Sequence, residues 1–290
     1  MRINSSLVLL CAMPLCSLGW WSQPPLGIDP TLTTMRNVDG IADNSFLVEE
    51  AYNQEPGVVQ HIFTAFYTFD SAGADTRNWN LAFTQEWPLL SQKHQVSYTV
   101  PYNFTDTSGP TVDGLGDVLL NYRYQVCYDE RMLTAFAPRL SLILPTGDDL
   151  RGGGEETLGY QINLPFSTTI GDEWFVHLNA GATFLPDAAS SNGRDLWYYN
   201  LGASAIYAAT PDLHFLVEWI GLWIESPQSN GGLGYEFASL ISPGFRKAFN
   251  FSNGAQIVVG AAAPLGLTGE SRDYGFCLYV SFEHFFRRRS

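Results

Sequence analysis

The sequence predicts an all-β protein, an antiparallel up-and-down transmembrane β-barrel of about twelve strands. Apolar and polar residues alternate in a series of amphipathic segments from Val58 to Phe286. The connectors between these segments are by turns long and rich in Gly and Asp, then short. Such a meander places its long loops at one end and its tight turns at the other, as outer-membrane barrels do. The long connectors are 70–76, 105–116, 146–157, 186–195, 226–232 and 266–273, and the short ones are 90–93, 128–131, 171–173, 210–212 and 249–254.

Composition agrees with a surface that does not face water. Charged residues make up 15% of the 290 residues, below the usual quarter, and aromatic residues make up 14%. The formal net charge of −14 argues against nucleic acid as a partner. Acidic residues such as Asp148 and Glu155 crowd the long connectors, which indicates a solvated rim. A divalent cation bound there is the alternative, although the spacing matches no calcium loop.

The chain begins with the pattern of a secretory signal peptide, over residues 1–19. Arg2 precedes an apolar stretch that is too short to span a bilayer, and no apolar run of about 18 residues follows anywhere else. Beyond it lie two cysteines, Cys127 and Cys277, and an even count in an oxidising compartment invites a disulfide. These two fall on the fourth and twelfth predicted strands, which are not neighbours, so we expect thiols that are not bridged.

The strands can be placed in order from the period-two pattern. In the run from Trp174 to Phe184 every second residue is apolar, while the opposite face carries residues such as His177 and Asn179. A soluble β-sandwich would also alternate, but its strands are mostly about five or six residues long, and these runs are longer. An even number of strands places both chain ends in the periplasm. The predicted strands are 58–70, 77–89, 96–104, 116–127, 132–145, 160–170, 174–184, 196–209, 213–225, 233–248, 255–264 and 274–286.

Aromatic spacing predicts where the strands cross the membrane interfaces. Trp174 and Phe184 are ten residues apart, and so are Trp197 and Tyr207. Ten residues at about 3.3 Å each, tilted by roughly 40°, project to about 25 Å, the height of the apolar band of such barrels. These four residues are therefore the candidate aromatic girdle, and outer-membrane lipid is the expected surrounding.

The opposite phase of the strands points charged residues into the lumen. These lumen-facing candidates are Glu86, Arg123, Arg139, His177, Glu218, Glu236, Arg246 and Glu283. They could form a structural network that pairs across the barrel, or a constriction that selects what passes. Twelve strands give a backbone radius of roughly 12 Å, much of it filled by inward side chains, so a narrow or plugged lumen is expected.

Two segments flank the predicted barrel of residues 58–286. Residues 20–57 are not strand-like, and form either a short periplasmic helix or a plug in the lumen. We favour partial insertion, because four apolar or aromatic residues need a dry environment: Phe46, Leu47, Val48 and Tyr52. At the other end, a basic tail of residues 287–290 follows Phe286. Barrels of this type usually end on the aromatic residue that the barrel assembly machinery recognises, so Phe282 and Phe286 are the candidates for that signal.

Three stretches of the sequence carry a family resemblance: Ser45–His61, Gly114–Tyr124 and Leu144–Asp148. They resemble a family of outer-membrane barrels named for the MetA pathway of phenol degradation. Their glycines and the Pro-Thr-Gly have physical reasons in any hairpin, but their order and spacing are family-like. The resemblance implies a barrel that helps small, often aromatic or hydrophobic, compounds to enter, and it carries over no site residues.

The leading functional hypothesis is passive passage of small solutes through a narrow lumen in the outer membrane of a Gram-negative-type envelope. The alternative is a sealed structural or interaction barrel. A lipase-like enzyme is the third hypothesis, but no Ser and His assemble on the lipid-facing wall, since His61 and His284 lie toward the periplasmic side. The sequence predicts no catalytic residue, no cofactor and no metal site, because the cysteines and histidines lack ligand spacing.

Overall fold

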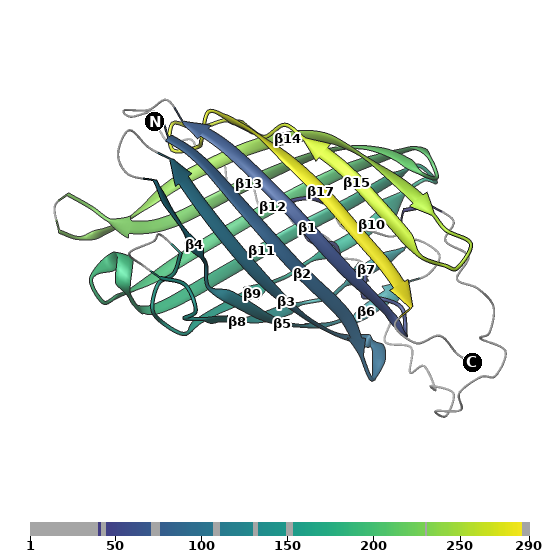
Figure 1. Ribbon diagram of the computed structural model, residues 1–290, viewed down its shortest axis with the longest axis horizontal. Helices are drawn as coiled ribbons and strands as arrows, with labels where there is room; N and C mark the ends of the chain where they lie inside the picture. Colours follow the sequence, from purple (N-terminus) through teal and green to yellow (C-terminus); the bar gives the residue numbers. More distant parts are fainter. Residues whose placement is uncertain are drawn as a thin grey trace, which may run out of the picture. The chain divides into compact units, whose positions relative to one another are not determined.

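The computed structural model describes residues 40–41, 45–70, 76–106, 111–129, 133–148, 153–229 and 231–285. Three predicted features lie outside these ranges: the signal peptide, the N-terminal segment up to residue 39, and Phe286 with the basic tail. Figure 1 shows the described strands side by side and strongly tilted.

The strands of the described residues form one antiparallel sheet that closes on itself. β1 (Val58–Asp70) pairs on one side with β2 (Thr76–Leu89) and on the other with β17 (Tyr274–Phe285). The seventeen strands make twelve passes, since several passes are interrupted, so the predicted barrel is confirmed. The others are β3 (Ser91–Asp106), β4 (Val112–Leu115), β5 (Val118–Tyr124), β6 (Cys127–Asp129), β7 (Thr134–Phe136), β8 (Arg139–Leu144), β9 (Gly159–Asn163), β10 (Phe166–Ile170), β11 (Trp174–Ala188), β12 (Arg194–Thr210), β13 (Leu213–Pro227), β14 (Leu233–Asn250), β15 (Gln256–Ala262) and β16 (Leu265–Gly266).

Prolines interrupt three passes, two of which the sequence predicts as continuous strands, while the third was predicted to end at Pro264. Pro138 separates β7 from β8, Pro165 separates β9 from β10, and Pro264 separates β15 from β16. Proline has no N–H to donate to the ladder, but its carbonyl still accepts. The Pro138 carbonyl accepts the N–H of Tyr124 at 3.0 Å, and the Pro165 carbonyl accepts that of Ala137 at 3.2 Å. Each break is therefore local, and the wall stays closed.

The fourth pass also differs from its prediction, but not because of a proline. It begins at Val112, earlier than expected, and is broken where Asp117 turns toward the long connector after β8. The Asp117 Oδ1 accepts the backbone N–H groups of Thr146 at 3.1 Å and Gly147 at 2.9 Å, and its Oδ2 accepts that of Glu155 at 2.9 Å. This single carboxylate ties the connector to the barrel rim.

The alternation of long and short connectors is present in the structure. The shortest connector is a single residue, Leu90, with φ of 63°. The turn predicted at 90–93 is therefore too long, since β3 begins at Ser91. One long connector contains a short 3-10 helix, η2 (Ala189–Ser191). Among the described residues no helix is long and apolar enough to cross a membrane. Cys127 in β6 and Cys277 in β17 are not joined by a disulfide.

The two faces of the barrel wall differ as the sequence predicts. On β17 the outward residues Phe276, Leu278 and Val280 are 37–47% exposed, while Cys277 and Tyr279 between them are buried. A closed barrel with such an apolar outer belt satisfies its backbone internally and suits the hydrocarbon region of a membrane.

The four predicted girdle residues meet in two pairs across neighbouring strands. Trp174 on β11 is the register partner of Tyr207 on β12, with ring centroids 5.2 Å apart. Phe184 and Trp197 pair at the other end of the same two strands, at 4.6 Å. Two aromatic pairs therefore bracket the apolar stretch between them.

Candidate functional site

Residues 45–54 run through the barrel lumen. Val48 and Ala51 are almost completely buried. Five backbone N–H groups of this stretch donate to side chains of the inner wall, so the wall supplies the partners that a sheet would otherwise supply. The bonds run from Leu47 and Val48 to Glu218 Oε1 (both 2.9 Å), from Glu49 to Asn179 Oδ1 (2.8 Å), from Ala51 to Ser167 Oγ (2.8 Å) and from Gln54 to Gln95 Oε1 (2.7 Å).

The described residues on either side of this stretch lie at the same end of the barrel. The carbonyl of Gly40 accepts Gln256 Nε2 at 2.8 Å, and Gln256 begins β15 beside a short connector. At the other side of the segment, Val58 begins β1 at that same end. Between them Leu47 and Glu49 reach the middle of the strands. We call residues 45–54 the plug; its tip is at 46–49.

Apolar side chains of the plug find the dry environment that the sequence predicts for them. The Phe46 ring lies 5.0 Å from that of Tyr279 and packs against the small core on the inner wall. Tyr52 packs against a cluster that includes Ala135, and its hydroxyl donates to the carbonyl of Leu133 at 2.5 Å. Residues 45–54 of the predicted N-terminal segment thus pack against the inner wall.

Two arginines of the wall bind the plug at its tip. Arg139 on β8 donates from Nε to both carboxylate oxygens of Glu49, at 3.0 and 2.8 Å. Arg123 on β5 donates to Glu49 Oε1 at 3.2 Å and to the carbonyls of Glu50 and Tyr52 at 2.9 and 2.8 Å. The Arg123 side chain is only 3% exposed. A buried guanidinium thus binds both a carboxylate and backbone carbonyls of the plug.

The surroundings of Glu49 favour its charged form. Burial alone would raise the pKa of this carboxyl, but the charges of Arg139 and Arg123 and the hydrogen bond from Asn163 outweigh it. The pKa of Glu49 is therefore lowered from its ordinary value. The carboxylate is ionised wherever the plug is in place at neutral pH.

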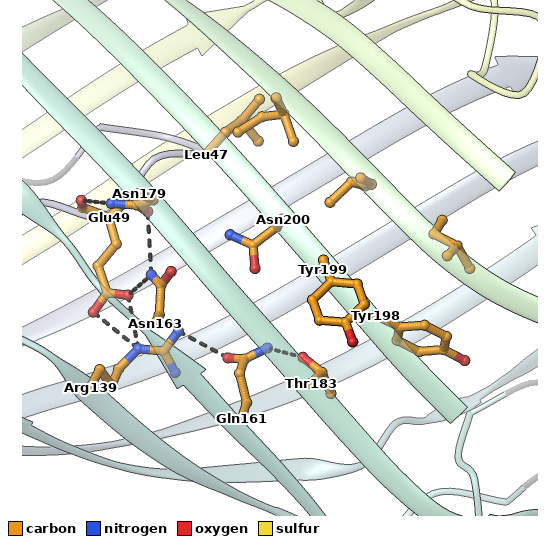
Figure 2. Close-up of a pocket in the computed structure, with 13 residues that line it drawn as sticks. Leu47, Glu49, Arg139, Gln161, Asn163, Asn179, Thr183, Tyr198, Tyr199 and Asn200 are labelled. Carbon is orange, nitrogen blue, oxygen red and sulfur yellow. Dashed lines mark hydrogen bonds and ion pairs between the residues drawn. The ribbon is translucent and has the colours of Figure 1, made fainter. Parts of the chain in front are cut away.

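A cavity of about 520 Å³, which we call the vestibule, lies on the long-connector side of the plug tip. Leu47 and Glu49 of the plug line it together with wall residues of β8, β9, β11, β12 and β13. Figure 2 shows Glu49, Arg139, Asn163 and Gln161 gathered on one side of the vestibule. Another side is apolar, formed by Ile220, Leu222 and Ile224 of β13. The vestibule is amphipathic and has the plug as its floor.

The structure places the predicted lumen residues on the inner wall. Glu236 lies near the rim, where it is the register partner of Ile224 and its exposed carboxylate accepts a hydrogen bond from Ser226 Oγ at 3.1 Å. The others are buried or half-buried: Glu86, Arg123, Arg139, His177, Glu218, Arg246 and Glu283.

These charges do not simply pair across an empty lumen. Arg123 and Arg139 converge on Glu49 of the plug, and Glu86 Oε2 lies 3.9 Å from Arg123. Glu218 accepts plug backbone, and Glu283 Oε1 accepts Gln54 Nε2 at 3.5 Å. The plug is thus the common partner of charges on several strands.

Glu49 and the neutral residues that hold the plug are not among the site residues predicted from the sequence. Asn179 and Ser167 belong to the polar phase of their strands, which is the signal that could have found them. That phase marks a side chain as inward-facing. It does not say that a main chain will come within reach of it.

One arrangement in the lumen has the residue types of a hydrolase. Ser167 Oγ lies 2.7 Å from His177 Nδ1, but Ser167 is fully buried beneath Ala51. The other ring nitrogen of His177 has no hydrogen-bond partner, so no acid orients this histidine as a catalytic triad requires. In the part of the chain that the structure describes, no three His, Cys, Asp or Glu residues gather as a metal site.

Comparison with known proteins supports the fold. No family model matches the sequence, and no curated protein matches it, so the family resemblance stays a prediction. The chain is similar to an outer membrane channel from Pseudomonas putida F1, with a TM-score of 0.62 and 16% identity, covering 81% of this chain and 98% of that one.

Weaker likenesses are to the NanC porin (TM-score 0.47, 9% identity, 78% of this chain and 100% of that one) and to the β domain of the Bordetella autotransporter BrkA (TM-score 0.47, 14% identity, 80% and 100%). We draw nothing from these two. The closed barrel and its apolar belt put the protein in an outer membrane, the location that the sequence predicts.

Proposed function

We propose that the protein is a passive channel of the outer membrane for small solutes, and that the plug gates it. The observation that carries this proposal is the way in which the plug occupies the lumen. The lumen above the plug is an open vestibule with Leu47 and Glu49 in its floor, and Gly40 and Val58, on either side of the plug, both lie at the short-connector end of the barrel. Such a segment can withdraw toward the short-connector end without unthreading the barrel.

Small aromatic or hydrophobic compounds are the solutes that we propose. The apolar side of the vestibule, with Ile220, Leu222 and Ile224, offers them a surface, and the polar side keeps the cavity hydrated. A volume of about 520 Å³ suits a small molecule rather than a peptide or an oligosaccharide.

A disulfide between plug and wall tests the gate. Ser45 Oγ and Ser204 Oγ lie 2.9 Å apart, so the pair Ser45→Cys and Ser204→Cys can be bridged. Cys127 and Cys277 are first replaced by alanine. In planar bilayers we expect conductance from the reduced protein, with transient block by small aromatic compounds, and silence after oxidation. The single Ser45→Cys variant is the matched control, and its conductance should not change on oxidation.

The alternative is a sealed barrel with a structural role. It is favoured by the number of wall side chains that accept backbone N–H groups of the plug, namely Glu218, Asn179, Ser167 and Gln95. It predicts that reduced and oxidised proteins are equally silent, and that only deletion of the plug produces conductance.

A further inference from the structure

The carboxylate of Glu49 occupies a site that other residues build. Arg139 Nε reaches both of its oxygens, at 3.0 and 2.8 Å, Arg123 Nη1 lies 3.2 Å away, and Asn163 Nδ2 donates at 2.7 Å. Three side chains from three strands, two of them cationic, thus converge on one carboxylate. Short charge-assisted bonds of this kind are the strong ones.

The donors are held in place by contacts that do not involve Glu49. Arg139 also donates to Asn121 Oδ1 at 2.9 Å and to Gln161 Oε1 at 3.0 Å. Arg123 donates from Nε to Asn53 Oδ1 at 2.8 Å. Because these donors are oriented in advance, little conformational entropy is lost when another carboxylate binds in the place of Glu49.

The site is open to the vestibule. The Glu49 and Arg139 side chains are 19% and 17% exposed, and both line the cavity. The apolar residues Ile220, Leu222 and Ile224 line the same cavity. A ligand that reaches Arg139 with a negative group can therefore lay an apolar body against β13.

We propose that this is a binding site for small monocarboxylates with an apolar body, aromatic or short aliphatic, and that Glu49 is its built-in competitor. The inference rests on the proposed channel function and names a class of solute for it. An entering carboxylate takes over the bonds of Arg139 and Asn163, and the Glu49 side chain swings into the vestibule. The plug then loses its link to β8, so that binding loosens the gate.

Competition within the chain sets the affinity. A tethered carboxylate acts at an effective concentration in the millimolar range or above, so the wild-type protein binds an external carboxylate weakly. Removing the competitor should tighten binding. A residue that merely stabilised the lumen would have the opposite effect when removed.

The test measures benzoate binding to the full-length protein in detergent by calorimetry. We expect Glu49→Ala to bind benzoate at least tenfold more tightly than the wild type, and Glu55→Ala, an exposed acid of the same segment, to behave as the wild type. Adding Arg139→Gln to Glu49→Ala should abolish binding. Benzyl alcohol and benzylamine should not bind, and acetate should bind less tightly than benzoate.

Unchanged or weaker benzoate binding by Glu49→Ala would overturn the proposal, and so would equal binding of benzyl alcohol. If Glu49→Ala does not fold, Glu49→Gln keeps the size of the side chain and should show the same gain. The two proposals fail separately. Tight benzoate binding, together with a conductance that does not change when the disulfide between positions 45 and 204 forms, would refute the channel alone. Gating without benzoate binding would refute the carboxylate site alone.

Discussion

Replacing Arg123 by methionine should release the plug. This side chain is 3% exposed and donates to Asn53 Oδ1, to Glu49 Oε1 and to the carbonyls of Glu50 and Tyr52, at 2.8 to 3.2 Å. No other residue of the wall binds as many groups of the plug among the hydrogen bonds of the described residues. Methionine has a similar length but donates nothing.

The expected loss follows from the kind of contact. Removing one partner of a buried ion pair costs about 3–5 kcal/mol, because the other groups are left without a donor. In the Arg123→Met variant these groups regain water when the plug leaves, so the cost falls on the closed state. At about 1.4 kcal/mol for each tenfold change, the ratio of open to closed protein should rise by roughly two to three orders of magnitude.

Single-channel recording in planar bilayers measures this ratio as the open fraction. The matched control is Arg77→Met, since Arg77 pairs with Asp106 at 3.8 Å on the exposed rim and such a pair contributes about 0–1 kcal/mol. Heat-modifiable mobility on gels checks that both variants are folded. A folded Arg123→Met protein with the open fraction of the wild type would refute the reasoning.

Three further predictions concern the plug, the rim and the belt. The pKa of Glu49 is lowered in the closed state, so its contribution to closure is complete above the ordinary value of 4.5 and is lost as the pH falls through the lowered pKa. Conductance should therefore rise below pH 4.5, and Glu49→Gln should abolish this pH dependence. Asp117→Ala removes the acceptor of three backbone N–H groups and should destabilise the connector after β8 by about 2–4 kcal/mol, measured as faster proteolysis there, while Asp117→Asn loses less. Leu178→Arg should cost about 2–4 kcal/mol in refolding into vesicles and Trp174→Arg only about 0–1, although the two are equally exposed; equal costs would refute the assigned depth.

The barrel could be predicted from the sequence because each strand carries its own evidence. The alternation around Trp174 and Phe184 assigns two faces without reference to any other strand, and the register with β10 then follows from the short turn at 171–173. The breaks at Pro138 and Pro165 were open to the same reasoning, since proline cannot donate to the ladder. They were missed because the apolar alternation continues across them.

The site could be predicted only in part, for a physical reason. An inward charge such as Arg123 is visible in the strand pattern, but its partners are carbonyl groups of the plug, and a carbonyl has no sequence signature. In the sequence, Glu49 is one of several acidic residues that precede the first strand, and nothing distinguishes it from the others. What marks it is the convergence of β5, β8 and β9 on one point, which is a property of the closed barrel.

Charged contacts, rather than neutral ones, decide whether the plug stays. Each ordered residue of the plug gives up about 1–2 kcal/mol of backbone entropy, and each neutral hydrogen bond, such as that from Ala51 to Ser167, returns about 0.5–1.5 kcal/mol. These quantities are similar, so the neutral bonds fix the path of the plug without locking it. Arg123, Arg139, Glu218 and Glu283 supply the bonds that involve ionisable side chains of the wall. A solute, a proton or a substitution that acts on one of these four groups should therefore move the gate, whereas changes to the amides that line the path should leave it nearly where it was.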